Sequence, residues 1–319
     1  MQIEATQVKI TEFGSPDVLI KSASSWQSEE PQVAVYYASI NPIDLKTRAG
    51  IGWAAKENAD KLPWCPGYDV AGELLDAEGR GSGQYVCGLI GFPFQGGGYA
   101  NIVTTDLENL VTIPEGVELR QAAALPLAGL TAYQALSRFG ELRTGEQVVV
   151  LGAGGGVGHL VVQLAVKMGV EVTSISRSEN HAWLSALGAT HCIDYQQPDW
   201  QVRAAAEASL VIDCVGGDVG LSLIAELPCG TDVVTLPTVT ADAMIEAGDK
   251  RGCHVTGMLV QQDTKVLKQL VDQLAEGKLK VHIDAEFELE KAADAHRMLE
   301  QGGVKGKVVL TVPENLKHS

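Results

Sequence analysis

The part of the sequence that most constrains the fold runs from Gln147 to Met168 and reads QVVVLGAGGGVGHLVVQLAVKM. A short apolar run typical of a buried strand leads into a glycine-rich turn, and an apolar stretch long enough for a helix follows. Turns of this kind are typical of dinucleotide-binding folds, because glycines let backbone N–H groups approach a pyrophosphate at a helix N-terminus. We therefore predict that the turn binds a dinucleotide cofactor through Gly154, Gly155, Gly156 and Val157.

The register of the turn supports this interpretation. Ala153 takes the first position of the GxGxxG spacing, Gly155 the second and Gly158 the third. The second position allows the backbone to approach the ligand, and the third lets the helix pack closely on the strand. The alternative is a glycine-rich turn without a ligand, but the strand, the helix and the following strand all fit the motif.

The hydrophobic pattern changes along the chain and indicates two domains. Residues 1–120 contain short apolar runs separated by glycine and proline, as in a small β domain. In residues 121–258 apolar strands alternate with amphipathic helices, which predicts a doubly wound parallel sheet with helices on both faces. We expect residues 259–319 to complete that parallel sheet and then to return to the first domain.

Charge and composition narrow the classes of partner. The formal net charge is -16, which disfavours binding to nucleic acid and to an anionic membrane surface. The first ten residues lack the basic and apolar regions of a signal peptide. The six cysteines form no CxxC pair, which favours reduced thiols and a cytoplasmic location.

Seven segments of the chain, in order, resemble one group of enzymes. They read FGSPDVL, ASINPIDLKTRAG, PGYDVAGEL, AAALPLAGLTAYQAL, GAGGGVGHLVVQLA, LGATHCIDY and GKVVL. This set resembles the medium-chain dehydrogenase/reductase superfamily, and the nearest branch is the zinc-independent quinone oxidoreductases with the related enone reductases. The resemblance spans residues 5–312 and implies an α/β protein with a GroES-like β domain, a Rossmann domain and a homodimeric assembly.

The resemblance also bears on the catalytic zinc that related alcohol dehydrogenases hold with Cys, His and Glu or Cys ligands. The matching positions here carry Asn41, Tyr68 and Leu127, none of which is a usual zinc ligand. No histidine precedes His159, and residues 92–99 read FPFQGGGY where relatives hold a structural zinc with four cysteines. We therefore predict no metal site. Without a Lewis acid, an electron-poor acceptor such as a quinone or an α,β-unsaturated carbonyl is favoured over an alcohol.

The end of the second strand of the α/β domain indicates which nicotinamide cofactor binds. An NAD site places an acidic residue there to bind the ribose hydroxyls, but this chain has Ser176, Arg177 and Ser178. Arg177 can pair with a 2′-phosphate, and both serines can donate hydrogen bonds to it. We therefore predict NADPH as the cofactor, preferred over NADH by about tenfold or more. The alternative is a solvated arginine on a surface turn.

The resemblance assigns further residues to the cofactor site. Asn180 stands where many relatives carry a lysine, and Tyr195 matches a tyrosine near the adenosine phosphate. Thr131 matches a threonine near the nicotinamide, and Lys307 matches a lysine that approaches the cofactor. The alternatives are a threonine within a helix and a surface lysine. The remaining assigned contacts are Val215, Leu236 and Met258.

The predicted catalytic residues are Asn41, Asp44 and Tyr68. Asn41 and Asp44 lie in the segment NPID, which in the family lies beside the nicotinamide. Asn41 could donate to a developing oxyanion, Asp44 could hold the ribose or a water, and Tyr68 could donate to a substrate carbonyl. We expect a polar turn here, so truncating Asn41 should affect turnover more than stability. The alternatives are an Asx-turn that caps a helix, and a tyrosine that only packs.

These observations predict an enzyme that transfers a hydride from NADPH to a quinone or an enone. Trp53, Trp64, Phe92 and Phe94 are candidates for an apolar substrate slot, although such residues also occur in cores and dimer contacts. The rival hypothesis is an NADPH-binding protein with a structural or regulatory role and little turnover, because a fold does not fix function. An alcohol dehydrogenase is a third hypothesis, disfavoured by the three ligand positions.

Overall fold

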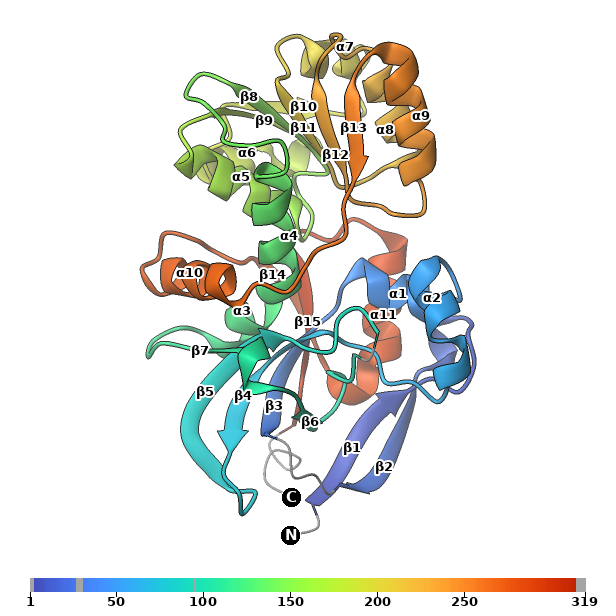
Figure 1. Ribbon diagram of the computed structural model, residues 1–319, viewed down its shortest axis with the longest axis vertical. Helices are drawn as coiled ribbons and strands as arrows, with labels where there is room; N and C mark the ends of the chain where they lie inside the picture. Colours follow the sequence, from blue (N-terminus) through green and yellow to red (C-terminus); the bar gives the residue numbers. More distant parts are fainter. Residues whose placement is uncertain (1–2, 27–30, 95, 314–319) are drawn as a thin grey trace. The chain divides into compact units, whose positions relative to one another are not determined.

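The computed structural model describes residues 3–26, 31–94 and 96–313, and the chain divides into two compact units. The first unit combines the chain up to Ala128 with the chain from Gln262 onward, and the second unit is Gly129–Gln261. In Figure 1 the first unit contains the blue and cyan segments together with the red C-terminal segment. The predicted fold class, a β domain with a doubly wound parallel sheet, is confirmed.

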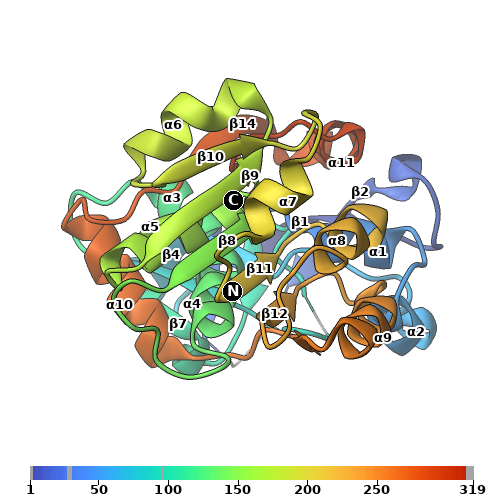
Figure 2. The same cartoon turned by 90° about the horizontal axis from the view of Figure 1, so that it is seen from above.

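The second unit is built on a six-stranded parallel sheet in the order β10-β9-β8-β11-β12-β13. The order reverses between β8 and β11, which is the switch point of a Rossmann fold. Helices α5 and α6 lie on one face of the sheet, and α8 and α9 on the other (Figure 2). The strands are β8 (Gln147–Leu151), β9 (Glu171–Ser176), β10 (His191–Asp194), β11 (Leu210–Asp213), β12 (Asp232–Thr235) and β13 (His254–Gly257).

Helices cover both faces of this sheet, and the central strand is apolar on both sides for that reason. Val148, Val149 and Val150 are consecutive residues of β8 and each is fully buried, as expected for a central parallel strand. The helices of the unit are α4 (Pro126–Leu136, which begins in the first unit), α5 (Gly158–Lys167), α6 (His181–Ala186), α7 (Trp200–Ala205), α8 (Gly217–Ile224) and α9 (Ala241–Arg251), with a short 3-10 turn at Ser178–Asn180.

The first unit contains a mixed sheet in the order β14-β15-β3-β4-β5-β7, with β6 paired to β3, and a separate β1-β2 hairpin. Only the β14-β15 pair is parallel among the described strands of this unit. The strands are β1 (Ile3–Lys9), β2 (Ile20–Trp26), β3 (Gln32–Ser39), β4 (Asp69–Leu75), β5 (Gly81–Leu89), β6 (Ile102–Thr104), β7 (Leu110–Thr112), β14 (Ile283–Glu288) and β15 (Lys307–Thr311). The helices are α1 (Pro42–Arg48), α2 (Trp53–Glu57), α3 (Leu119–Ala124), α10 (Thr264–Ala275) and α11 (Ala292–Gln301).

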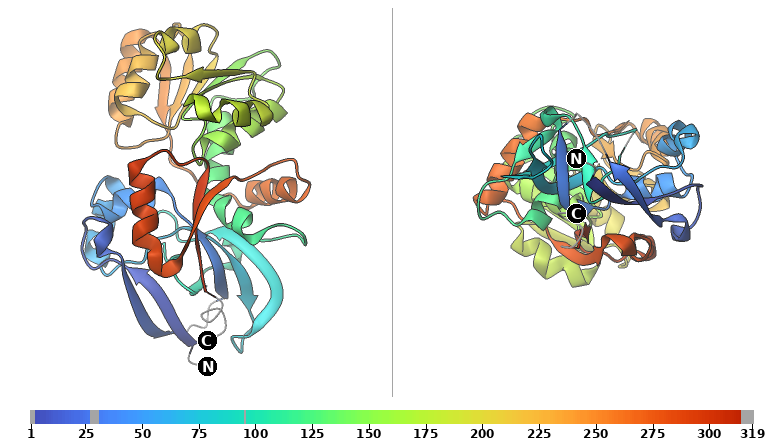
Figure 3. Two further views of the ribbon diagram at one scale, coloured as in Figure 1. Left: turned by 180° about the vertical axis from the view of Figure 1, so that it is seen from behind. Right: turned by 90° about the horizontal axis from the view of Figure 1, so that it is seen from below.

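The C-terminal segment does not complete the parallel sheet, so our expectation for residues 259–319 is wrong in that respect. β15 lies between β14 and β3, and its antiparallel register with β3 pairs Val309 with Ser39 and Thr311 with Tyr37. Figure 3 shows this red segment beside the blue strands of the first unit. The run KVVLT predicts a buried strand, but strand propensity does not say which sheet offers it two partners.

Helix α10 illustrates how local sequence fixes an element of the first unit. Asp263 precedes the helix, and its Oδ1 accepts a hydrogen bond of 2.9 Å from the Val266 backbone N–H, as an N-cap residue does. The buried residues Leu267, Leu270, Val271 and Leu274 recur at helical spacing and form its apolar face. Among the described residues, no helix is long and apolar enough to cross a membrane.

Candidate functional site

The predicted cofactor residues of the second unit lie at one edge of the parallel sheet. All but one lie at, or just after, the carboxyl end of a strand, which is where open parallel sheets bind ligands. We call these strand ends the cofactor edge. The exception is Thr131, which lies within α4 and is 7% exposed. The residues at the edge are Gly154–Val157 after β8, Ser176–Asn180 at and after β9, Tyr195 after β10, Val215 after β11, Leu236 after β12 and Met258 after β13.

The glycine turn has two glycines that are required for different reasons. A Cβ on Gly158 would lie 2.3 Å from the Gly152 carbonyl oxygen and 2.7 Å from Ala153 Cα, so a larger residue would push α5 away from the strand. A Cβ on Gly155 would meet only the Gly152 oxygen, at an ordinary 3.4 Å. Packing within the described protein therefore does not demand glycine at 155. The space left there fits close approach by a ligand such as a pyrophosphate.

Two residues that we did not predict from the sequence, His159 and Asp213, hold the backbone at this edge through hydrogen bonds. His159 is fully buried, and its Nδ1 donates to the Gly155 carbonyl at 2.9 Å, which fixes the turn. Asp213 ends β11, and its Oδ1 accepts hydrogen bonds from the backbone N–H groups of Val215 and Gly216 at 2.9 and 2.8 Å. An aspartate that ends an apolar strand before a glycine pair was the available signal for this role.

Arg177 is paired with an acidic side chain, and the serines beside it have partners of their own. Arg177 Nη2 lies 3.2 Å from Glu179 Oε1, and the Ser176 hydroxyl donates to the Arg177 carbonyl at 3.1 Å. The pKa of Asp194 is lowered chiefly by the hydrogen bond from the Gln196 backbone N–H, and also by hydrogen bonds from Ser178. Arg177 is therefore partly neutralised, and both serine hydroxyls have protein partners.

Other predicted contacts border the same edge. A Cβ on Gly154 would lie 2.7 Å from Asn180 Nδ2, so the buried Asn180 packs directly against the glycine turn. Tyr195 and Val215 are 40% and 44% exposed, which is high for large apolar side chains. A bound nucleotide would cover such surfaces at a ligand-binding edge.

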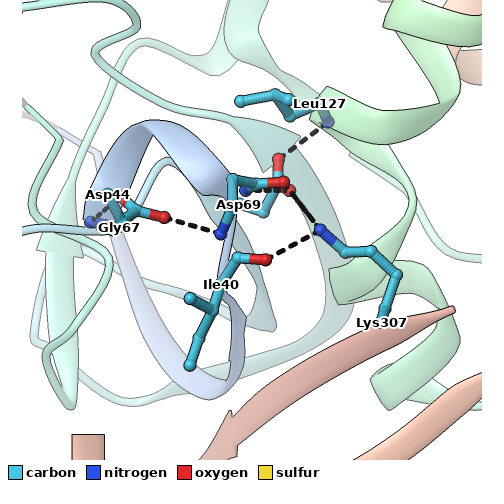
Figure 4. Close-up of polar contacts among 7 residues, drawn as sticks. Ile40, Asp44, Gly67, Asp69, Leu127 and Lys307 are labelled. Carbon is cyan, nitrogen blue, oxygen red and sulfur yellow. Dashed lines mark hydrogen bonds and ion pairs between the residues drawn. The ribbon is translucent and has the colours of Figure 1, made fainter. Parts of the chain in front are cut away.

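The first unit contains a buried polar network around Asn41. Figure 4 shows its labelled members Asp69, Leu127 and Lys307. Asn41 Nδ2 donates to Asp69 Oδ2 at 2.8 Å, and Asn41 Oδ1 accepts from Lys307 Nζ at 2.6 Å. Lys307 Nζ also donates to the Ile40 carbonyl at 3.0 Å and lies 4.0 Å from Asp69 Oδ2. The second Asp69 oxygen accepts from the Leu127 backbone N–H at 2.8 Å, near the start of α4. The network thus joins β4, α4 and β15 to the segment between β3 and α1.

Asp44 is held by backbone groups at the start of α1. Its Oδ2 accepts from the Asn41 backbone N–H at 2.8 Å, and its Oδ1 accepts from the Gly67 N–H at 3.0 Å. Asn41 is the N-cap residue of this helix and Pro42 its first residue, which is the position that proline favours. The helix-capping role that we considered as an alternative is therefore present in the structure.

Burial shifts the titration of the charged groups in this network. It raises the pKa of Asp44 to about 7, against the opposing effect of the Asn41 and Gly67 hydrogen bonds. Burial also raises the pKa of Asp69 to about 6, while the Lys307 ammonium and the Asn41 and Leu127 hydrogen bonds oppose that rise. Burial lowers the pKa of Lys307. Each group depends on its hydrogen bonds to remain charged.

The expectation that Asn41 and Asp44 lie on a polar turn at the surface is wrong. Asn41 is 1% exposed and Asp44 is fully buried. Sequence spacing placed both residues in the NPID segment, but it could not show that β15 and β4 enclose that segment. A buried polar group is costly to leave without its partner.

Tyr68 lies in an aromatic cluster and its hydroxyl already has an acceptor. It is fully buried, and its hydroxyl donates to the Pro93 carbonyl at 3.1 Å. Its ring centroid lies 5.2 Å from that of Phe92 and 6.5 Å from that of Trp64. Trp53 and Phe94 form a second pair, at 6.3 Å, with Lys61 Nζ 5.3 Å from the Phe94 ring centroid.

Comparisons with known proteins agree over nearly the whole chain. Residues 27–115 match the family model of the alcohol dehydrogenase GroES-like domain, and residues 187–310 match that of zinc-binding dehydrogenases. A zinc-type alcohol dehydrogenase-like protein of Schizosaccharomyces pombe is 32% identical, over 87% of this chain and 86% of its own length. The 2-methylene-furan-3-one reductase of Solanum lycopersicum is 31% identical, over 94% of this chain and 77% of its own length.

A solved structure extends the likeness to three dimensions. The quinone oxidoreductase from Coxiella burnetii superimposes with a TM-score of 0.91 at 36% identity, over 97% of this chain and all of that one. The chain belongs to the medium-chain dehydrogenase/reductase superfamily, in its zinc-independent quinone oxidoreductase branch. The resemblance that the sequence motifs carry is thereby confirmed, and the protein is an oxidoreductase of an NAD(P)H-binding family.

The residues present do not fit the zinc ion that other members of the superfamily bind. At the three ligand positions, both polar ends of the Asn41 amide are hydrogen-bonded, the Tyr68 hydroxyl donates to a carbonyl, and Leu127 offers only an apolar side chain. None of these is a thiolate, imidazole or carboxylate. Over the described residues, no three His, Cys, Asp or Glu side chains are grouped so that they could hold a metal ion.

Proposed function

We propose that this protein transfers a hydride from NADPH to a quinone or to an α,β-unsaturated carbonyl. The bound cofactor supplies the hydride, and a proton from water completes the two-electron reduction of the acceptor. The observation that carries the proposal is the set Asn41, Tyr68 and Leu127 at the zinc positions of a reductase fold. Because this set cannot hold a Lewis acid, an acceptor that is already electron-poor is favoured over an alcohol.

The role proposed for the cofactor edge is to bind the dinucleotide and to favour the cofactor that carries a 2′-phosphate. The space at Gly155 suits the pyrophosphate, and Arg177 suits the 2′-phosphate of NADPH. The names of the relatives support NAD(P)H in general, and the choice of NADPH rests on Arg177.

The role proposed for the first unit is to bind the acceptor and stabilise the negative charge that forms on it. An amide nitrogen carries two hydrogens, and Asp69 accepts one of those on Asn41, which leaves the other for an acceptor oxygen. The aromatic cluster around Tyr68 offers apolar faces of the kind that bind a quinone ring. The homodimer and the cytoplasmic location remain predictions.

One observation favours the rival function, an NADPH-binding protein with little turnover. Asn41 and Tyr68 are 1% and 0% exposed, and the Tyr68 hydroxyl donates to Pro93. A reactive acceptor would need access that these side chains lack in the free protein.

The experiment that separates the two functions is a turnover panel. Purified protein is mixed with NADPH and with a series of quinones and enals, and the absorbance of the reduced nicotinamide is followed. We expect oxidation with at least one acceptor. Binding of NADPH without turnover on any member of the panel would instead support the rival function.

We also predict that the reaction needs no metal, because the three ligand positions do not fit zinc. Metal analysis of the purified protein should find well below one zinc per chain. Treatment with a chelator followed by gel filtration should leave the turnover rate unchanged. Stoichiometric zinc whose removal abolishes turnover would contradict this prediction.

A further inference from the structure

Lys307 contributes a buried positive charge to the network around Asn41. It is the first residue of β15 and is only 3% exposed. Its ammonium donates to Asn41 Oδ1 at 2.6 Å. It also donates to the Ile40 carbonyl at 3.0 Å, as Figure 4 shows. The resemblance assigned Lys307 to the cofactor, whereas in the structure its charge is directed at the Asn41 amide.

The chemistry of its neighbours decides which way the Asn41 amide faces. An ammonium can only donate, and an ionised carboxylate can only accept. Oδ1 of Asn41 must therefore face Lys307, and Nδ2 must face Asp69, as observed. A cation on the carbonyl end of an amide draws electrons from the N–H groups and makes them stronger donors.

We propose that the Lys307 ammonium supplies the positive charge that a zinc ion supplies in the metal-dependent relatives, and that it acts through Asn41 on negative charge forming on the acceptor. Lys307 is thus a positioning and polarising residue, because Asn41 is the group that contacts the acceptor. This inference rests on the proposed function. It explains why Asn41, at a former ligand position, contacts a cation of the protein itself.

A purely structural role makes a different prediction. In that case Lys307 only balances the charge of Asp69, 4.0 Å away. Removing both charges together would then restore both stability and turnover, because replacing a buried ion pair with neutral groups is often close to neutral for stability. The two roles are therefore separable by a double substitution.

The test compares Lys307→Met with the double variant Lys307→Met/Asp69→Asn. Lys307→Met leaves the Asp69 carboxylate without its cation, so both the melting temperature and kcat should fall. In the double variant the new amide at position 69 can donate to Asn41 Oδ1 if the Asn41 amide reverses. The melting temperature should then recover. The reversed amide no longer presents a polarised N–H, so kcat should stay roughly tenfold or more below wild type.

The KM for the acceptor, the Kd for NADPH and the kcat of a control variant separate an effect on catalysis from an effect on binding. The KM for the acceptor should change much less than kcat, and the Kd for NADPH should stay within about threefold of wild type, a shift of under 1 kcal/mol. Lys280→Met, at an exposed lysine of the same unit, is the matched control and should leave kcat unchanged.

The possible outcomes have distinct meanings. Recovery of kcat in the double variant would overturn the proposal and leave Lys307 as a charge balance for Asp69. Failure of the double variant to regain stability would contradict the amide reversal, and a loss of NADPH affinity of about tenfold would make Lys307 a cofactor contact. Absence of turnover in the wild type would instead overturn the proposed function.

Discussion

Replacing Arg177 with aspartate is expected to lower the affinity for NADPH by at least about tenfold and to shrink or invert the preference over NADH. A charge-assisted hydrogen bond of this kind contributes roughly 1.5–3 kcal/mol. The aspartate would repel the 2′-phosphate of NADPH and would accept from the free 2′-hydroxyl of NADH. The measurement is the Kd of each cofactor for both proteins.

The surroundings of Arg177 are expected to reduce the preference of the wild type for NADPH over NADH. The Arg177 guanidinium is paired with the Glu179 carboxylate at 3.2 Å, and the Ser176 hydroxyl donates to the Arg177 carbonyl. We therefore expect a preference near the lower end of the range, about tenfold for a contribution of 1.4 kcal/mol. It should weaken with added salt, because Arg177 is one-third exposed and its charge is partly screened.

The matched control for this experiment is Arg203→Asp. Arg203 is an exposed residue of α7 in the same unit, and its replacement makes the same change in net charge. It should leave the ratio of the two dissociation constants unchanged. Equal affinity of the wild type for both cofactors, or an equal response to the two substitutions, would show that Arg177 is only a solvated turn residue.

The second large effect is expected from Asn41→Ala, which should lower the free energy of unfolding by about 3–5 kcal/mol. The truncation removes hydrogen bonds to two buried charged groups, Asp69 at 2.8 Å and Lys307 at 2.6 Å. The alanine side chain can neither donate a hydrogen bond to Asp69 nor accept one from Lys307. The measurement is urea unfolding of the wild type and the variant at neutral pH.

Asn109→Ala is the matched control for this substitution. Asn109 is half-buried, and its Nδ2 donates to the neutral Thr105 hydroxyl at 3.1 Å. Its truncation should cost only about 0.5–1.5 kcal/mol, the usual contribution of a neutral hydrogen bond. If Asn41→Ala costs no more than Asn109→Ala, the network around Asn41 does not stabilise the fold as we describe.

The positions of the candidate cofactor residues at the carboxyl ends of the second unit's strands were the part most readily predicted from the sequence. These residues follow the carboxyl ends of consecutive strands, so locating the strands locates the edge. Gly155 and Arg177 were assigned in this way and Tyr195 from the resemblance, and their contact with a cofactor stays a prediction. The ion pair of Arg177 with Glu179 was not predicted, because residue identity two positions away does not say whether the carboxylate turns back toward the guanidinium.

The network of the first unit could not be predicted as a network. The sequence suggested Asn41 and Asp44 as candidates, but their burial depends on β4 and β15, which come from distant parts of the chain. Lys307 lies 266 residues from Asn41, and only the pairing of β15 with β3 brings the two into contact. Asp69 was not among the residues predicted for the site.

The sequence by itself determined the Rossmann and GroES-like fold class, the glycine turn and the absence of zinc ligands at the three matching positions. These properties depend on short spacings and on residue identity, both of which can be read directly from the sequence. Only the tertiary structure decided that the C-terminal strand joins the sheet of the first unit, and that an ammonium and a carboxylate meet at the two ends of one buried amide. The physical reason is that burial and ion pairing depend on contacts between distant segments, and local propensity does not specify those contacts.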